Sequence, residues 1–260
     1  MARETEKWWD ETSAWYQSEC KIPIAVHYGP GSPSEDKLRL IGSVRGKRVL
    51  EIGCGGAQCA IAFAKMGAKV SAIDISSEQL KFAKRLAAKN RVKIDFYRGD
   101  MKSLRQIRSG SQDVVFSAFA LLYVDDLPRC FSEVKRVLKK GGLFVFSLGH
   151  PFWSVVANEP KDAKSPSPKY SYFDAGKYEK IEKWPDGSKH KFVMYRHTVS
   201  GLYSALRKAG FDVEAIVEPD SRKRHAKDPW YWRWEYTPKL LKLVPPTIIF
   251  KCRPRRSGKL

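Results

Sequence analysis

Short apolar runs alternate with amphipathic helical patterns along most of this chain, and this alternation restricts the fold more than any other feature. The runs are rich in β-branched and aromatic residues and have the length of buried strands. They cover residues 48–52, 69–74, 94–98, 113–117, 143–148, 211–217 and 247–252. Helical patterns lie between them at residues 57–66, 77–89, 127–138 and 199–209. Because alternating strands and helices form right-handed crossovers, the sequence predicts an α/β fold with a doubly wound parallel sheet.

The alternation stops after residue 148. Residues 150–197 are rich in proline, lysine and aromatic residues, and Pro185-Asp186-Gly187 is a turn signal between two expected strands. A chain of 260 residues fits one domain that carries an insertion. We therefore divide it into an N-terminal segment (1–45), a core (46–149), a substrate cap (150–197) and the end of the sheet (198–260), which contains an aromatic and basic insertion at 219–246 and a basic tail.

The chain is strongly basic, with a formal net charge of +20 and a pI of about 9.8. Such a charge favours an anionic partner, either nucleic acid or an acidic membrane surface. The excess is spread along the chain, with local concentrations at residues 222–227 and in the tail at 251–259. Dispersed lysine is typical of a solvated surface, so nucleic acid is an alternative partner rather than a required one.

Neither the apolar residues nor the cysteines indicate export or membrane insertion. We find no apolar run of about 18 residues and no apolar stretch in the opening MARETEKWWD, so we expect a cytoplasmic protein without a transmembrane segment. The cysteines are odd in number, scattered and free of CxxC pairs, which predicts reduced thiols and no zinc site. They are Cys20, Cys54, Cys59, Cys130 and Cys252.

A glycine-rich segment, EIGCGGA at residues 51–57, lies where the first strand turns into the first helix. Glycines there let the backbone approach a ligand, and the helix N-terminus points its amides at that ligand. The dinucleotide fingerprint fails at its third glycine, because that position is Gln58. Glu51 would repel a pyrophosphate but suits the amino group of a methionine moiety. The segment therefore favours S-adenosylmethionine over NAD.

Two more acidic positions follow at strand ends. Asp74 closes the second strand about 20 residues after Gly53, where a carboxylate can accept hydrogen bonds from ribose hydroxyls. Asp100 follows the third strand, where it can accept from an adenine amino group while Met101 packs on the ring. Each acid taken alone can also cap the next helix. Together with Glu51, however, they place three acids at successive strand ends, and this pattern favours a nucleoside cofactor.

Five segments carry a family resemblance: VLEIGCGGA, VSAIDIS, YRGDM, DVVFSAFALLYV and VLKKGGLFVFSLGHPF. Over roughly residues 46–151 the chain resembles class I S-adenosylmethionine-dependent methyltransferases of the methyltransferase domain 11/25 type. The resemblance implies a Rossmann-like seven-stranded sheet in the order 3-2-1-4-5-7-6, with the last strand antiparallel and S-adenosylmethionine across the strand ends. Many relatives carry glycine where this chain has Ala57, which adds a methyl group near the methionine moiety. The cofactor-contacting positions implied are Glu51, Gly53, Gly55, Asp74, Ile75, Asp100, Met101 and Ser117.

Methyl transfer requires little acid or base catalysis from the protein, because a sulfonium methyl is already activated. Catalysis then depends mainly on positioning the reactants. A base helps where the nucleophile carries a proton, and the candidates are His150, His27 and Tyr28. His150 has a structural alternative, since it precedes Pro151 at a strand exit. The N-terminal aromatics, spaced for one helix face, form a lid over the cofactor in related enzymes or else pack on the sheet. They are Trp8, Trp9, Trp15 and Tyr16.

Several specialised classes are excluded. The fourth strand ends in SAFA instead of the (Asp/Asn)-Pro-Pro-aromatic turn of base-amine methyltransferases, and no cysteine nucleophile lies between Cys59 and Cys130. Asp125 and Asp126 fit a helix entry better than a metal site. The leading hypothesis is methyl transfer to a small molecule enclosed by residues 150–197 and 219–245. The alternatives are a tRNA or rRNA methyltransferase, for which the aromatic segment 228–236 could stack bases, and a non-catalytic S-adenosylmethionine-binding protein acting through its basic surface.

Overall fold

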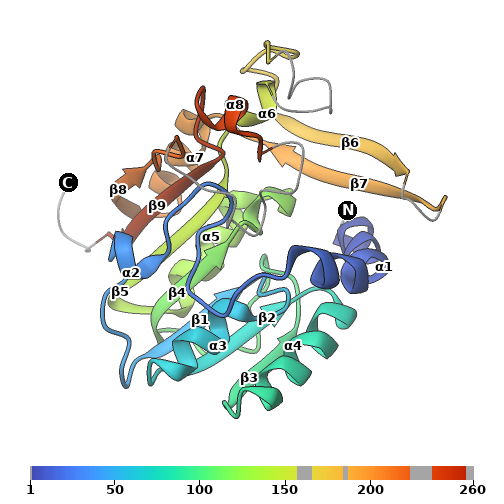
Figure 1. The fold of residues 1–260 in the computed structure, drawn as a ribbon. Helices are drawn as coiled ribbons and strands as arrows, with labels where there is room; N and C mark the ends of the chain where they lie inside the picture. Colours follow the sequence, from blue (N-terminus) through green and yellow to red (C-terminus); the bar gives the residue numbers. More distant parts are fainter. Residues whose placement is uncertain (1, 157–165, 184–186, 223–235, 256–260) are drawn as a thin grey trace.

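A seven-stranded sheet forms the centre of the molecule, in the order β3-β2-β1-β4-β5-β9-β8 (Figure 1). The structure is a computed structural model that describes residues 2–156, 166–183, 187–222 and 236–255. Only β9 runs antiparallel to its neighbours within this sheet. The predicted order 3-2-1-4-5-7-6 is therefore confirmed. The strands are β1 (Arg48–Ile52), β2 (Lys69–Asp74), β3 (Ile94–Arg98), β4 (Gln112–Ala118), β5 (Leu138–Gly149), β8 (Phe211–Val217) and β9 (Thr247–Pro254).

Helices cover both faces of this sheet, as a doubly wound fold requires. Apolar side chains of α5 (Leu127–Val137) and α7 (Val199–Lys208) pack on one face, and those of α3 (Gln58–Lys65) and α4 (Ser77–Lys89) pack on the other. Side-chain caps start three of the helices: Ser76 accepts from the Gln79 N–H, Asp126 from Arg129 and Thr198 from Gly201. Asp126 thus opens a helix, as predicted.

The strand boundaries agree closely with the apolar runs, except at β5. The helical pattern predicts a helix to residue 138 and a strand from 143, but Leu138 is already extended and pairs with Gln112 of β4. Gly141, with a positive φ of 74°, lies inside this longer strand. The strand therefore begins five residues earlier than the apolar run alone indicates.

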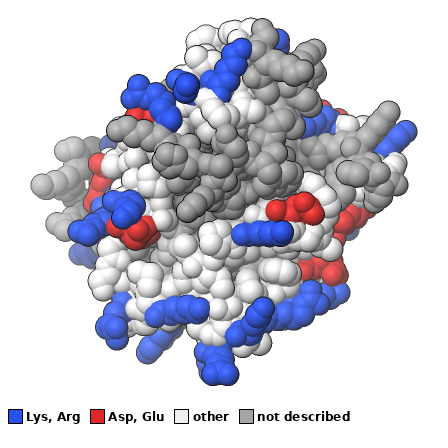
Figure 2. Space-filling view, in the orientation of Figure 1, with Lys and Arg blue, Asp and Glu red and all other residues white. Residues whose placement is uncertain are grey.

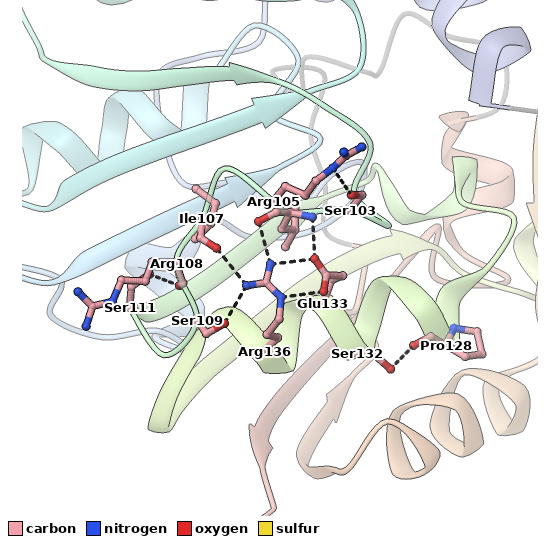
Figure 3. A network of polar contacts seen from close by, with 11 residues as sticks. Ser103, Arg105, Ile107, Arg108, Ser109, Ser111, Pro128, Ser132, Glu133 and Arg136 are labelled. Atoms are coloured by element: carbon pink, nitrogen blue, oxygen red, sulfur yellow. Dashed lines mark hydrogen bonds and ion pairs between the residues drawn. The ribbon is translucent and has the colours of Figure 1, made fainter.

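The loop after β3 is held by one ion pair of α5 (Figure 3). Arg136 donates from Nη2 to the Leu104 carbonyl at 2.8 Å and from Nη1 to the Ile107 carbonyl at 3.1 Å. The carboxylate of Glu133 accepts from the Leu104 N–H at 2.8 Å and from two nitrogens of Arg136. Because Asp100 and Met101 begin this loop, the pair fixes the backbone that follows them.

Two further elements lie over the carboxyl edge of the sheet. The first is α1 (Ala2–Cys20), which packs against α4 and β7. The second is an antiparallel hairpin of β6 (Gly176–Lys183) and β7 (Lys189–Arg196), which confirms the two strands expected around the 185–187 turn, although residues 185 and 186 lie outside the described ranges. Shorter elements are α2 (Glu35–Leu38), η1 (Leu121–Tyr123), α6 (Trp153–Val156) and α8 (Pro238–Leu241). No helix in the described ranges is long and apolar enough to cross a membrane.

Candidate active site

A cavity of about 350 Å³ lies at the carboxyl ends of the central strands, beneath α1 and the hairpin. Its floor comes from the glycine-rich loop after β1 and from the ends of β2, β4 and β5. Its roof comes from α1 and from the facing side chains of β6 and β7. The cavity therefore brings together segments from both ends of the chain, with the predicted cofactor loop on one side.

The backbone of the glycine-rich loop needs glycine at the predicted positions. Gly53 and Gly55 have positive φ values of 65° and 51°. A Cβ on Gly53 would lie 2.4 Å from the Ala120 Cβ, and one on Gly56 would lie 2.7 Å from the Gln17 side chain. Ala57 also has a positive φ, of 60°, and is fully buried. Its conformation is one that glycine adopts more easily, which agrees with the glycine found there in relatives.

Glu51 is a buried carboxyl group without a cation. Its Oε2 accepts from the Ala60 N–H at 2.7 Å, and the side chain lines the cavity. Burial, with a smaller contribution from the nearby Asp74, raises the pKa of Glu51 to about 8. No described Lys, Arg or His forms an ion pair with it within 4.0 Å. A positively charged ligand group would therefore stabilise its ionised form.

Asp74 lies beside the same loop, as its position at the end of β2 predicts. Its Oδ2 accepts from the Gly55 N–H at 2.7 Å and its Oδ1 from the Ser76 N–H at 2.9 Å. Burial raises the pKa of Asp74 to about 6 even though these N–H groups lower it. The helix-capping alternative is wrong, because Ser76 caps α4. Each carboxylate oxygen keeps a lone pair, so Asp74 can accept from ribose hydroxyls.

Ile75, Asp100 and Met101 also line the cavity. Asp100 accepts from the Lys102 N–H at 2.8 Å, and its other oxygen lies 3.6 Å from the Lys102 Nζ. With Glu51 and Asp74, which have no cation within ion-pair distance among the described residues, these residues form a cradle next to a loop that brings backbone close. The cradle fits S-adenosylmethionine, which carries a sulfonium, an ammonium, a carboxylate and two ribose hydroxyls.

Comparison with known proteins agrees with this geometry. Residues 50–146 match the family described as methyltransferase domain. A crystal structure of an S-adenosylmethionine-dependent methyltransferase from Mesorhizobium loti shares 25% identity and a TM-score of 0.62, covering 83% of this chain and 94% of that one. Residues 50–146 form a class I S-adenosylmethionine-dependent methyltransferase domain. S-adenosylmethionine is the cofactor of this domain, and the chain is a methyltransferase.

Two relatives compare at the level of sequence. A Haemophilus influenzae protein, named as uncharacterized, is 25% identical over 92% of both chains. A ubiquinone biosynthesis O-methyltransferase of Bordetella avium is 28% identical over 54% of this chain and 55% of its own length. The match therefore spans about half the length of that relative and of this chain.

Ser117 does not take the predicted place at the cofactor. It is fully buried within β4, and its Oγ donates to the Ile52 carbonyl at 3.0 Å. It does not line the cavity, whereas the next three residues, Ala118, Phe119 and Ala120, do. The hydroxyl thus bonds within the sheet, and the surface that faces the cofactor begins one residue later. Phe119 there has a positive φ of 59°, a conformation that bulky residues rarely adopt.

The three predicted proton acceptors lie in different surroundings. Tyr28 is fully buried, its hydroxyl donates to Glu35, and both effects raise the pKa of Tyr28. Tyr28 does not line the cavity, so we leave it out of the site. His27 does line the cavity, and burial lowers the pKa of His27 to about 4. His27 is therefore neutral at pH 7, as a proton acceptor must be.

His150 lines the cavity with both ring nitrogens engaged. The Phe152 N–H donates to Nδ1 at 3.1 Å, which places the ring proton on Nε2, 2.7 Å from Glu218 Oε1. A neutral imidazole has one lone pair and one N–H, and both are in use. The geometry therefore argues against His150 as the base and favours its structural alternative.

Sequence reasoning missed Arg196 and His197 at the end of β7, which line the cavity opposite the sheet. Burial lowers the pKa of His197 to about 4, and its buried Nε2 has no hydrogen-bond partner among the described residues. The stretch from Lys189 to Arg196 reads KHKFVMYR, so Arg196 is one of several basic residues that flank a short apolar run. No local signal separates these side chains from surface ones, since their burial depends on residues distant in the chain.

Proposed function

We propose that this methyltransferase transfers a methyl group to a small molecule bound in the same cavity as the cofactor. The observation that carries the proposal is the shared cavity: the cofactor cradle and the walls supplied by α1 and the hairpin enclose one space. A small acceptor held there would meet the cofactor away from bulk water, and this enclosure favours in-line displacement.

In this proposal the chain's residues bind and orient the reactants. Glu51 accepts from the amino group of the methionine moiety, and Asp74 accepts from the ribose hydroxyls. Asp100 accepts a hydrogen bond from the adenine amino group, while Ile75 and Met101 pack on the ring. When bound, S-adenosylmethionine supplies an activated sulfonium methyl, so the protein needs no metal for the transfer.

A proton acceptor is required where the acceptor is a hydroxyl. His27 and His197 both line the cavity, and burial holds the pKa of each near 4, so both are neutral at pH 7. His197 lies next to Arg196 on the side of the cavity opposite the sheet, and its buried Nε2 has no partner among the described residues. We propose His197 as the base, with His27 as the second candidate.

Two observations favour a small molecule over RNA. The Bordetella avium relative is named for ubiquinone biosynthesis, which involves a small acceptor. The basic groups of the described tail and cluster are paired with acids: Arg253 with Glu214 at 2.6 Å, Arg255 with Asp212 at 3.3 Å and Arg222 with Asp220 at 2.8 Å. Phosphate would have to displace these carboxylates.

The wider surface agrees with this reading. On the face drawn in Figure 2, Lys and Arg side chains are scattered around the edge, with acidic side chains beside several of them. Residues 223–227 and 256–259 of the predicted basic clusters, and residues 228–235 of the aromatic segment, lie outside the described ranges.

The test is methyl transfer from S-adenosylmethionine labelled in its methyl group, at about 150 mM salt to suppress non-specific phosphate binding. A metabolite extract and total RNA are offered separately. We expect label in a small-molecule fraction, lost in Asp74→Ala and kept in Asp95→Ala, which removes an exposed carboxylate from the adjacent strand. Label confined to a defined RNA position would overturn the proposal. Cofactor binding with no transfer to either pool would favour a non-catalytic role.

A further inference from the structure

Arg196 is the last residue of β7, and its guanidinium lies close to two tyrosine rings at the edge of the cavity. The Cζ atom is 4.1 Å from the ring centroid of Tyr170 and 4.2 Å from that of Tyr178. A guanidinium held over an aromatic ring keeps its N–H groups available to donate from its edge. Contact with two rings therefore limits the positions from which Arg196 can donate.

One edge of this guanidinium has no hydrogen-bond partner among the described residues. Nε and Nη2 are both buried, and neither has a hydrogen-bond partner among the described residues. Arg196 also forms no ion pair within the described part of the chain. Buried donors that stay unpaired are costly, and more so when they carry charge. Such an arrangement is typical of a site that is completed by a ligand.

Two other arginines of this chain show what the same edge binds. Arg136 donates from Nε and Nη2 to the two oxygens of Glu133, at 2.7 and 2.8 Å. Arg222 donates from the same two atoms to the two oxygens of Asp220, at 2.9 and 2.8 Å. In both cases a single planar carboxylate satisfies the pair of donors. This two-point geometry is the one for which arginine is best suited.

We propose that Arg196 binds a carboxylate carried by the methyl acceptor, through Nε and Nη2. This inference rests on the proposed function, since it names the chemical class of the acceptor. A carboxylate matches the single charge of the guanidinium, whereas a phosphate monoester would bring further negative charge into a cavity where four acids, Glu51, Asp74, Asp100 and Asp125, already outnumber the two lysines, Lys102 and Lys180. The acceptor is thus a small carboxylic acid, held by Arg196 at one end of the cavity.

Binding is tested first without turnover, using benzoate and its neutral isostere benzamide as probes. Each is titrated by calorimetry into protein saturated with S-adenosylhomocysteine. We expect the protein to bind benzoate at least about tenfold more tightly than benzamide, as charged hydrogen bonds imply, and Arg196→Gln to bring the ratio close to one. Arg196→Lys should keep only part of the preference, because an ammonium lacks the paired edge.

Arg207→Gln is the matched control, since Arg207 of α7 is ion-paired with Asp212 of β8 and does not line the cavity. It should keep the full preference for benzoate. Unchanged affinity of Arg196→Gln for S-adenosylhomocysteine shows that the variant is folded. Wild-type protein that does not prefer benzoate, or Arg196→Gln that keeps the preference, overturns the assignment.

Turnover gives a second, independent test. The labelled product from the metabolite extract should be retained on an anion-exchange column at pH 7, and Arg196→Gln should raise KM for it at least tenfold with a smaller change in kcat. A neutral or cationic product overturns the carboxylate assignment and leaves the proposed function standing. Absence of any labelled small molecule refutes the proposed function, and the benzoate titration then decides the role of Arg196 by itself.

Discussion

Cofactor affinity should rise steeply with pH, because Glu51 must lose a proton to bind an ammonium group. In the free protein burial raises the pKa of Glu51 to about 8, so the carboxyl is mostly protonated at pH 6. An ammonium of the ligand favours the ionised form, and binding therefore releases a proton. Ionising a group with a pKa of 8 lowers affinity about a hundredfold at pH 6 and about twofold at pH 8. The expected gain in affinity is about fiftyfold.

The assay is calorimetric titration of S-adenosylhomocysteine at pH 6, 7 and 8, in two buffers of different ionisation enthalpy so that proton release is counted directly. Glu51→Gln is the matched variant, since it keeps the size of the side chain and cannot ionise. Its pH dependence should fall to about twofold, the part left by Asp74, whose pKa burial raises to about 6. Equal slopes for wild type and Glu51→Gln, or affinity that falls with pH, would refute this assignment of the ammonium.

Three other outcomes follow from the same structure. Asp74→Ala should weaken S-adenosylhomocysteine binding by about 1.5 to 3 kcal/mol, because charged hydrogen bonds are lost, and the control Asp95→Ala should not. Equal calorimetric affinities of wild type and Asp74→Ala would mean that the ribose lies elsewhere. Arg136→Met should lower the free energy of unfolding in urea by about 2 kcal/mol, because it removes bonds to two loop carbonyls; a change within about 0.5 kcal/mol would mean that the loop holds itself. Trypsin should cut residues 2–20 more slowly with S-adenosylhomocysteine bound, and an unchanged rate would contradict α1 as a lid.

Strand order and cofactor loop could be predicted because their signals are local. Central strands such as β1 are buried on both faces and read as continuous apolar segments, and the positive φ of Gly53 and Gly55 favours glycine at those positions. The predicted contact of Ser117 with the cofactor is not supported, because a sequence pattern does not show which side chain at a strand end bonds to the neighbouring strand. The prediction of Tyr28 as a proton acceptor is not supported for a similar reason, because its hydroxyl donates to Glu35, seven residues away.

Arg196 shows why the acceptor side of the site could not be predicted. Its guanidinium is positioned by the rings of Tyr170 and Tyr178, and these residues are 26 and 18 positions away in the chain. In the sequence it is one charge among 48 Lys and Arg residues. Composition favoured an anionic partner on the surface, whereas the buried geometry favours an anionic group inside the cavity.

The N-terminal helix connects the two halves of this cavity. On one side Asp10 accepts from the Ser76 hydroxyl at 2.6 Å and from the Glu78 N–H at 3.2 Å, shortly after Asp74 in the chain. On the other side Glu11 lies 2.8 Å from the Nδ1 of His190 on the hairpin that also carries Arg196. A displacement of α1 would therefore loosen the cofactor end and the acceptor end together. Where α1 forms the roof of the cavity, a ligand can enter only when α1 is displaced. We therefore expect the cofactor and the acceptor to stabilise the same closed position of α1 and to bind cooperatively.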